Sequence, residues 1–266
     1  MPSRPTILVF DSGLGGLTVY REIAALRPDA AFIYAADDDA FPSGRLSESE
    51  VSARVVAVIG SLAATYRPDL VVVACNTAST VVLAELRRRF SVPFVGTVPA
   101  IKPACAASRT RRVSVLGTQA TVAREYTKTL IRDFAADCAV TLVGAAKLAG
   151  YAEAQLQGAP VTDALIADEI APCFVDDGAR TDTVVLACTH YPLLLDRLQA
   201  LSRWPVSFID PAPAIARRVV ELLGSAEAGA PPPPARVHFT SGRLPAALIP
   251  ALKPFGLTPD PVAGTI

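Results

Sequence analysis

The chain has 266 residues, of which 51% are hydrophobic, and this is enough for one large α/β domain or two smaller ones. Lys+Arg and Asp+Glu each number 25, so the formal net charge is zero, and no charged stripe indicates binding to nucleic acid or to a membrane surface. The first apolar run ends at Asp11, and no apolar stretch approaches the roughly 20 residues that span a bilayer. We therefore expect a soluble, cytoplasmic protein.

Short β-rich runs alternate with longer helical patterns along the chain. In the first part, strands are predicted at 6–10, 32–35, 70–74 and 94–96, and helices at 16–26, 49–66 and 77–90. Further along, strands are predicted at 113–116, 141–143 and 184–187, and helices at 121–134, 161–175 and 193–200. This alternation predicts an α/β fold with buried parallel sheets that helices cover on both faces.

A proline-rich segment, GAPPPPA at 229–235, interrupts this pattern near the end of the chain. Consecutive prolines cannot continue a helix or pair as a central strand, so we expect a polyproline loop on the surface. A last strand is predicted at 236–240, and a Pro-rich amphipathic tail follows it.

Ligands of open parallel sheets bind beyond the carboxyl ends of the strands, so the residues that follow each strand are candidates for chemistry. This rule selects four turns: DSGLGG (11–16), CNTAS (75–79), GTQAT (117–121) and CTHYP (188–192).

Two of these turns are near copies of each other. VVVACNT at 71–77 and TVVLACT at 183–189 both place a cysteine after a β-branched run and an alanine. Cys75 and Cys188 are separated by about the length of a domain, which indicates an internal duplication of a strand–turn–helix unit.

The other three cysteines, Cys105, Cys138 and Cys173, are expected to be buried structural thiols, the usual fate of a free cysteine. An odd number of cysteines without a CxxC spacing does not indicate a disulfide framework. With only two histidines in the chain, a zinc cluster is not expected either.

Two thiols that face each other across a cleft suit one type of reaction. Racemisation removes a proton from one face of a carbon and returns a proton to the other, so one cysteine abstracts while the other donates. Both cysteines are predicted to lie where a helix begins, and a helix N-terminus lowers a thiol pKa from its usual value of about 8.5. Taken singly, each cysteine could be an inert core residue. A transient redox disulfide between them is a weaker alternative, because redox dithiols usually lie close in sequence.

Seven segments in family order resemble the glutamate racemases of bacterial cell-wall synthesis. They cover most of the chain: FDSGLGGLTVYREI (10–23), DDAFPSGRLSESE (38–50), VVACNTAST (72–80), PFVGTVPAIKPA (93–104), VLGTQATV (115–122), VLACTHYPLL (185–194) and FIDPAPAIARRV (208–219). The resemblance implies two pseudo-symmetric α/β domains with the active site at their interface. The first domain would comprise 1–98 with 212–266, and the second 99–211.

The same resemblance implies the catalytic residues. Cys75 and Cys188 would be the two acid/base groups, the first serving D-glutamate and the second L-glutamate. Asp11 and His190 match auxiliary polar groups beside the cysteines, and Glu153 matches a possible further acidic partner. The alternatives are a helix cap for Asp11 and a core histidine for His190.

Substrate carboxylates can be held by backbone N–H groups at helix N-termini and by nearby hydroxyl or amide groups. Gly13, Gly15 and Gly16 would let the backbone approach closely. The predicted substrate-binding residues are Asp11, Ser12, Ser43, Gly44, Asn76, Thr77, Thr118, Thr121, Thr189 and His190. Ordinary helix capping is the alternative role for the Ser and Thr residues. The chain departs from the family at Ser43, where a tyrosine is common, and this puts strict substrate choice in doubt.

No cofactor and no metal are predicted. A P-loop and a Rossmann glycine pattern are absent, and Lys102 and Lys147 lie in no recognisable pyridoxal motif. The expected partner is glutamate, with a homodimer plausible and neither nucleic acid nor membrane involved. The alternatives are a racemase of aspartate or another amino acid, a non-catalytic amino-acid-binding or interaction protein, and a single-cysteine decarboxylase-like relative.

Overall fold

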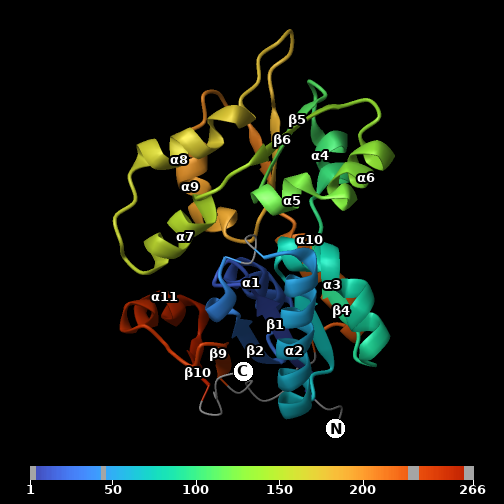
Figure 1. Cartoon of the computed structure of the whole chain (residues 1–266), viewed down its shortest axis with the longest axis vertical. Coiled ribbons are helices and arrows are strands. Elements are labelled where there is room, and N and C mark those ends of the chain that lie inside the picture. The colour runs from blue at the N-terminus through green and yellow to red at the C-terminus, as the bar shows by residue number, and fades with distance from the viewer. Residues whose placement is uncertain (1–3, 43–45, 227–233, 261–266) are drawn as a thin grey trace. The chain divides into compact units, whose positions relative to one another are not determined.

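The computed structural model describes residues 4–42, 46–226 and 234–260 (Figure 1). The chain divides into two compact units, Met1–Thr97 with Ala212–Ile266 and Val98–Pro211. Residues 229–233 of the predicted polyproline loop lie outside the described residues. No helix in the described ranges is long and apolar enough to cross a membrane.

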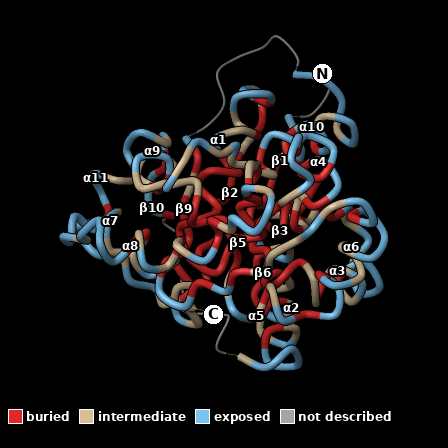
Figure 2. Tube along the Cα trace, turned by 90° about the horizontal axis from the view of Figure 1, so that it is seen from above, coloured by how far each residue is buried: buried red, intermediate tan, exposed pale blue. Residues whose placement is uncertain are grey.

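The first unit contains a six-stranded parallel sheet in the order β10-β9-β2-β1-β3-β4. Its strands are β1 (Thr6–Asp11), β2 (Ala31–Ala36), β3 (Leu70–Val73), β4 (Phe94–Gly96), β9 (Ala235–Phe239) and β10 (Leu257–Pro259). The central strands β1 and β3 are almost wholly buried (Figure 2), as expected of parallel strands that are covered on both faces. Their β-branched runs are what made these strands predictable.

Helices of the first unit pair with each other over the sheet. α1 (Leu17–Leu26) contacts α10 (Ala212–Leu223), and α2 (Glu48–Tyr66) contacts α3 (Asn76–Arg89). α2 begins with a capping box, in which Ser47 accepts from the Glu50 N–H and Glu50 accepts from the Ser47 N–H. Short helical turns complete the unit at η1 (Asp38–Ala40), η5 (Ala246–Leu248), α11 (Ile249–Leu252) and η6 (Lys253–Phe255).

The second unit contains a four-stranded parallel sheet in the order β6-β5-β7-β8. Its strands are β5 (Arg112–Gly117), β6 (Ala139–Gly144), β7 (Thr183–Ala187) and β8 (Ser207–Ile209). In chain order this is the same topology as the β2-β1-β3-β4 part of the first sheet, so β7 corresponds to β3. The duplication predicted from the two cysteine segments is therefore present in the strand order.

Helices of the second unit are α4 (Ile101–Ala107), α5 (Gln119–Ala123), α6 (Glu125–Phe134), α7 (Leu148–Leu156), α8 (Asp163–Ile170) and α9 (Leu195–Ala200), with short turns η3 (Ala171–Cys173) and η4 (Tyr191–Leu194).

Alternate residues of β7 enter two separate apolar clusters. Val184 and Leu186 belong to one, and Val185 and Ala187 to the other, so the sheet is packed on both faces.

Three helix predictions were wrong in detail. The helix predicted at 121–134 is broken at Arg124, whose extended conformation (φ −68°, ψ 142°) separates α5 from α6. The helix predicted at 161–175 ends at Ile170, because Pro172 removes an N–H and turns the chain into η3. No helix begins directly after Cys188, since η4 starts only at Tyr191.

Candidate active site

Cys75 lies at the N-cap position of α3, directly beyond the carboxyl end of β3. Its carbonyl accepts the Ser79 N–H at 2.9 Å, which fixes the first turn of the helix. The thiol is 4% exposed and donates a hydrogen bond to Ser12 Oγ at 3.5 Å. The structure thus brings Cys75 and Ser12 together, one after β3 and the other after the neighbouring strand β1.

Asn76 follows in the first turn of α3 and is 2% exposed. Within the described part of the chain, neither its amide nitrogen nor its amide oxygen has a hydrogen-bond partner. A buried polar group left in this state costs roughly 1–3 kcal/mol, so it marks a place where a ligand can supply the missing partner. Thr77, also predicted to bind substrate, is buried beside it.

Asp11 ends β1 and is fully buried. Its Oδ2 accepts the N–H of Gly13 at 3.2 Å and that of Gly16 at 3.1 Å, so the carboxylate shapes the glycine turn that leads into α1. Asp11 thus organises the turn before α1, whereas the helix cap considered as its alternative role is not formed, because the N-cap residue of α1 is Gly16 and no side chain caps it. A Cβ at Gly16 would lie 2.8 Å from Asp11 Cβ and 2.9 Å from Tyr34 Oη, and only glycine fits there.

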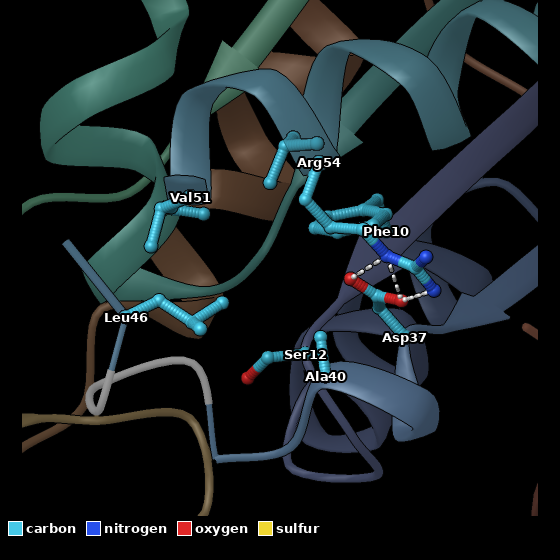
Figure 3. Close-up of a pocket in the computed structure, with 9 residues that line it drawn as sticks. Phe10, Ser12, Asp37, Ala40, Leu46, Val51 and Arg54 are labelled. Atoms are coloured by element: carbon cyan, nitrogen blue, oxygen red, sulfur yellow. Dashed lines mark hydrogen bonds and ion pairs between the residues drawn. The ribbon is translucent and has the colours of Figure 1, made fainter. Parts of the chain in front are cut away.

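An ion pair between buried Asp37 and half-buried Arg54 lies beside Ser12 and was missed by the sequence reasoning. Asp37, 3% exposed, follows β2 and accepts from Arg54 Nη2 at 2.7 Å and from Thr240 Oγ1 at 2.8 Å. Figure 3 shows Asp37, Arg54 and Ser12 around a small cavity with Phe10, Ala40, Leu46 and Val51. The strand-end rule applied to β2 would have found Asp37. Two predicted substrate-binding residues from the same loop, Ser43 and Gly44, lie outside the described residues.

Cys188 follows β7 in the second unit and is 7% exposed. Its Sγ lies 3.9 Å from Nδ1 of His190, and Nε2 of His190 lies 2.8 Å from Oε1 of Glu153 on α7. His190 is 2% exposed, so the imidazole joins a thiol to a carboxylate in a place shielded from water. The structure brings together the three residues that the sequence analysis assigned to this position.

Electrostatics at this position favour a charged imidazole. Burial by itself lowers the pKa of His190, but the hydrogen bonds to Cys188 and Glu153 outweigh it and raise the pKa well above its usual value. Tyr191, fully buried three residues after Cys188, has its pKa raised by burial and by the Cys188 charge, and so stays a neutral phenol. A positive imidazole beside a sulfur stabilises the thiolate form of the cysteine.

The remaining predicted polar residues also lie at strand ends. Thr118 is the N-cap of α5 after β5, where its Oγ1 accepts the Thr121 N–H at 3.1 Å and lies 2.9 Å from Thr121 Oγ1. The Thr118 hydroxyl is therefore engaged in capping, the alternative role foreseen for it, and the Thr121 hydroxyl is its hydrogen-bond partner. Thr189 is 6% exposed and follows Cys188 directly.

Among the described residues, no group of three or more His, Cys, Asp or Glu side chains could hold a metal ion.

Each sheet therefore presents one buried thiol beyond its carboxyl edge, with a hydroxyl partner in the first unit and an imidazole–carboxylate pair in the second. This is an arrangement of an α/β protein in which cysteine thiols are placed where acid–base chemistry could take place. A family model described as Asp/Glu/Hydantoin racemase matches residues 7–219, well over half of the chain. The chain belongs to the Asp/Glu/hydantoin racemase family, as its motifs indicated.

Individual relatives agree with this membership. The chain is 56% identical over 229 residues to the glutamate racemase of Brucella anthropi, covering 84% of this chain and 82% of that protein. It is 55% identical over 224 residues to the glutamate racemase of Brucella canis, covering 84% and 80%. The crystal structure of Escherichia coli glutamate racemase, in complex with L-glutamate and the activator UDP-MurNAc-ala, superposes with a TM-score of 0.87 at 41% identity and covers 96% of both chains.

Proposed function

We propose that this enzyme interconverts L- and D-glutamate without a cofactor, with Cys75 and Cys188 as the two acid/base groups. The observation that carries the proposal is the duplicated strand-end thiol, buried and hydrogen-bonded in each sheet. Relatives that are 55–56% identical over most of the chain are named glutamate racemases, which favours glutamate as the substrate.

In the proposed reaction, a thiolate takes the α-proton of bound glutamate and leaves a planar carbanion. The opposite thiol then gives its proton to the other face, so the two cysteines exchange protonation states in each turnover. Family order assigns Cys188 as the base for L-glutamate and Cys75 as the base for D-glutamate. Because the two enantiomers have equal free energies in water, any variant must change kcat/KM equally in both directions.

The polar neighbours have separate parts in the proposal. His190, held by Glu153, stabilises the Cys188 thiolate and shuttles its proton. Ser12 accepts from the Cys75 thiol and orients it. The unpartnered amide of Asn76 would hydrogen-bond a substrate carboxylate. Asp11, Thr77, Thr118, Thr121 and Thr189 complete the proposed binding residues, together with Ser43 and Gly44, which lie outside the described residues.

We also propose what the product is used for and how the enzyme assembles. D-glutamate is a building block of peptidoglycan, so the enzyme would supply cell-wall synthesis from the cytoplasm. A homodimer is part of the proposal, and light scattering of the purified protein tests it. A racemase of aspartate is the second candidate, because Ser43 replaces a common tyrosine in the segment that matches the family's substrate loop.

The deciding experiment incubates the purified protein with L-glutamate in deuterated water. We expect deuterium at the α-carbon together with loss of optical rotation, whereas L-aspartate should remain optically pure. A protein that binds glutamate but exchanges no α-proton over a range of pH would be a binding protein and not a racemase. Turnover of aspartate in preference to glutamate would establish the second candidate.

Two variants test the acid/base roles proposed for Cys75 and Cys188. Cys75→Ser and Cys188→Ser should each abolish racemisation with the fold intact, because a hydroxyl is far less acidic than a thiol. Cys138→Ser, at a partly exposed thiol of the second unit, is the matched control and should keep the activity of the unaltered protein. Near-normal turnover by either of the first two variants would remove that cysteine from the mechanism.

A further inference from the structure

Two thiols outside the proposed active site lie against each other in the second unit. Cys105 is on α4 and Cys138 is in the turn before β6, and both belong to the same apolar cluster. Cys138 Sγ lies 3.8 Å from the carbonyl oxygen of Cys105. Burial, and then the hydrogen bond with the Cys138 thiol, raise the pKa of Cys105. The Cys138 thiol thus lies directly against Cys105, although 32 residues separate the two cysteines in the chain.

The surrounding backbone is held in place by Arg111. Its Nη1 donates to the Cys105 carbonyl at 3.0 Å and lies 3.2 Å from Oδ2 of Asp137, while its own carbonyl accepts the Ala139 N–H at 2.8 Å. Arg111 itself has a left-handed conformation (φ 57°), which a non-glycine residue adopts only when its surroundings require it. One residue therefore ties the end of α4 to the segment on both sides of Cys138.

A hollow of about 340 Å³ opens beside this pair. Cys105 lines it, together with Lys102, Arg111, Phe134 and Asp137. Cys105 is 3% exposed, whereas Cys138 is partly exposed. The hollow thus gives a small reagent access next to Cys105, and of the two thiols Cys138 is the more exposed.

We propose that Cys105 and Cys138 form a site of reversible thiol modification, at which a low-molecular-weight disulfide oxidises the pair to an intramolecular disulfide. The Cys138 thiolate attacks one sulfur of the reagent, a new S–S bond forms, and one reagent thiolate leaves. Cys105 then loses its proton to water and attacks the Cys138 sulfur, and the second reagent thiolate leaves. Two protein thiols are oxidised, and one reagent disulfide is reduced to two thiols.

The order of attack follows from the structure. Burial keeps Cys105 protonated, so it is a poor first nucleophile but is well placed to resolve a mixed disulfide on its neighbour. The bond would close a loop that contains β5, α5 and α6. It would leave Cys75 and Cys188 untouched, since neither contributes to this cluster or hollow.

The test uses the full chain and oxidised glutathione, followed by acid quenching, alkylation under denaturing conditions and mass spectrometry. The unaltered protein should lose the mass of two hydrogen atoms and yield a linked peptide pair containing Cys105 and Cys138. Dithiothreitol should restore both thiols. Full alkylation of both cysteines, or a glutathione adduct that stays on Cys138, would overturn the proposal.

Variants then assign the two steps. Cys105→Ser should accumulate one glutathione on Cys138, because the resolving thiol is gone. Cys138→Ser should remain unmodified at Cys105. Cys173→Ser is the matched control: Cys173 is equally buried but belongs to the other apolar cluster, so its loss should leave the linkage unchanged. Since the first measurement needs no variant, the proposal stays testable even if a variant folds poorly.

Discussion

Glu153 holds one side of the His190 ring at 2.8 Å, while the other side of the ring faces Cys188 Sγ at 3.9 Å. The carboxylate comes from α7 and the imidazole from the turn after β7, so the packing of a helix on the sheet decides which ring nitrogen faces the thiol. Because Nε2 is paired with a carboxylate, the proton on Nε2 is held there, and in the charged form of the ring Nδ1–H faces the sulfur.

Glu153→Gln should therefore change the pH profile of the reaction. The hydrogen bond and the charge of Glu153 help to raise the pKa of His190, against the lowering by burial. A neutral amide removes part of that rise, so His190 loses its proton at a lower pH and the Cys188 thiolate loses its positive partner. We expect the alkaline limb of kcat/KM to move to lower pH, measured with L-glutamate over a range of pH.

Stability should follow the same titration with a definite sign. A raised pKa in the folded state means that the stabilisation by charged His190 is complete below the unfolded value of about 6.5 and is lost as pH rises through the raised value.

The matched control for the kinetic prediction is Glu125→Gln. Glu125 is an exposed carboxylate paired with Arg132 in the same unit, and its replacement should keep the original pH profile of kcat/KM. An unshifted profile in Glu153→Gln would mean that His190 does not titrate in turnover.

Asn76→Ala should separate stability from function. The buried amide has no partner in the protein, so its removal should leave the free energy of unfolding within about 1 kcal/mol of the original value. If the amide binds a substrate carboxylate, kcat/KM should fall roughly 10- to 100-fold, equivalent to one hydrogen bond to a charged group. Urea unfolding and steady-state kinetics measure the two effects.

Ser79→Ala, one turn along the same helix, supplies the contrast. Its hydroxyl donates to the Val73 carbonyl at 2.7 Å and accepts the Thr97 N–H at 3.1 Å, so its loss deprives two backbone groups of this partner. We expect a destabilisation of about 1–3 kcal/mol. If Asn76→Ala proved as destabilising as Ser79→Ala, the amide would have a structural role and its assignment to substrate binding would fail.

Gly16→Ala should damage the glycine turn of the first unit. The new Cβ would lie 2.8 Å from Asp11 Cβ, 2.9 Å from Tyr34 Oη and 3.1 Å from Ala74 Cβ, and none of these atoms can easily move. We expect a loss of about 1–3 kcal/mol in thermal unfolding experiments together with lower activity, because the turn shaped by Asp11 shifts. Gly150→Ala, on α7 with no atom within 4 Å of its added Cβ, is the control and should be neutral or stabilising.

The sequence predicted those parts of the fold that depend on local patterns. β-branched runs marked β1, β3 and β7, and the turn after each of these strands contains a predicted site residue. The break at Arg124 was not predictable in this way, because the residues on either side continue a helical pattern and only packing imposes the extended conformation. Pro172, by contrast, lies inside the helix predicted at 161–175 and is a visible sequence signal of helix interruption.

Side-chain pairing was less predictable than strand ends. The Asp37–Arg54 ion pair joins residues 17 positions apart, and the contact of Glu153 with His190 spans 37 positions. No periodicity encodes such contacts, so Glu153 could be assigned only through the family resemblance, and Asp37 was not assigned at all. The proximity of Cys105 and Cys138, which the sequence placed only among structural thiols, was not predictable for the same reason, since neither lies at the carboxyl end of a strand.

Arg27 offers a test of how α10, the first helix after the chain re-enters the first unit at Ala212, is attached to α1. Its guanidinium, 2% exposed, donates to both carboxylate oxygens of Asp29 at 2.9 and 2.8 Å and to the carbonyls of Leu223 and Gly224 at 3.2 and 3.0 Å. It thereby fastens the end of α10 to the end of α1.

Arg27→Met keeps most of the side-chain volume but leaves the Asp29 carboxylate and the two carbonyls without this donor. Breaking a buried pair from one side is strongly destabilising, so we expect a loss of about 3–5 kcal/mol in urea unfolding. Arg21→Met on the same helix removes an exposed charge that lies 3.9 Å from Glu22, and it should cost at most about 0.5 kcal/mol. Equal stability of the two variants would show that burial of Arg27, and not its four hydrogen bonds, holds the end of α10 in place.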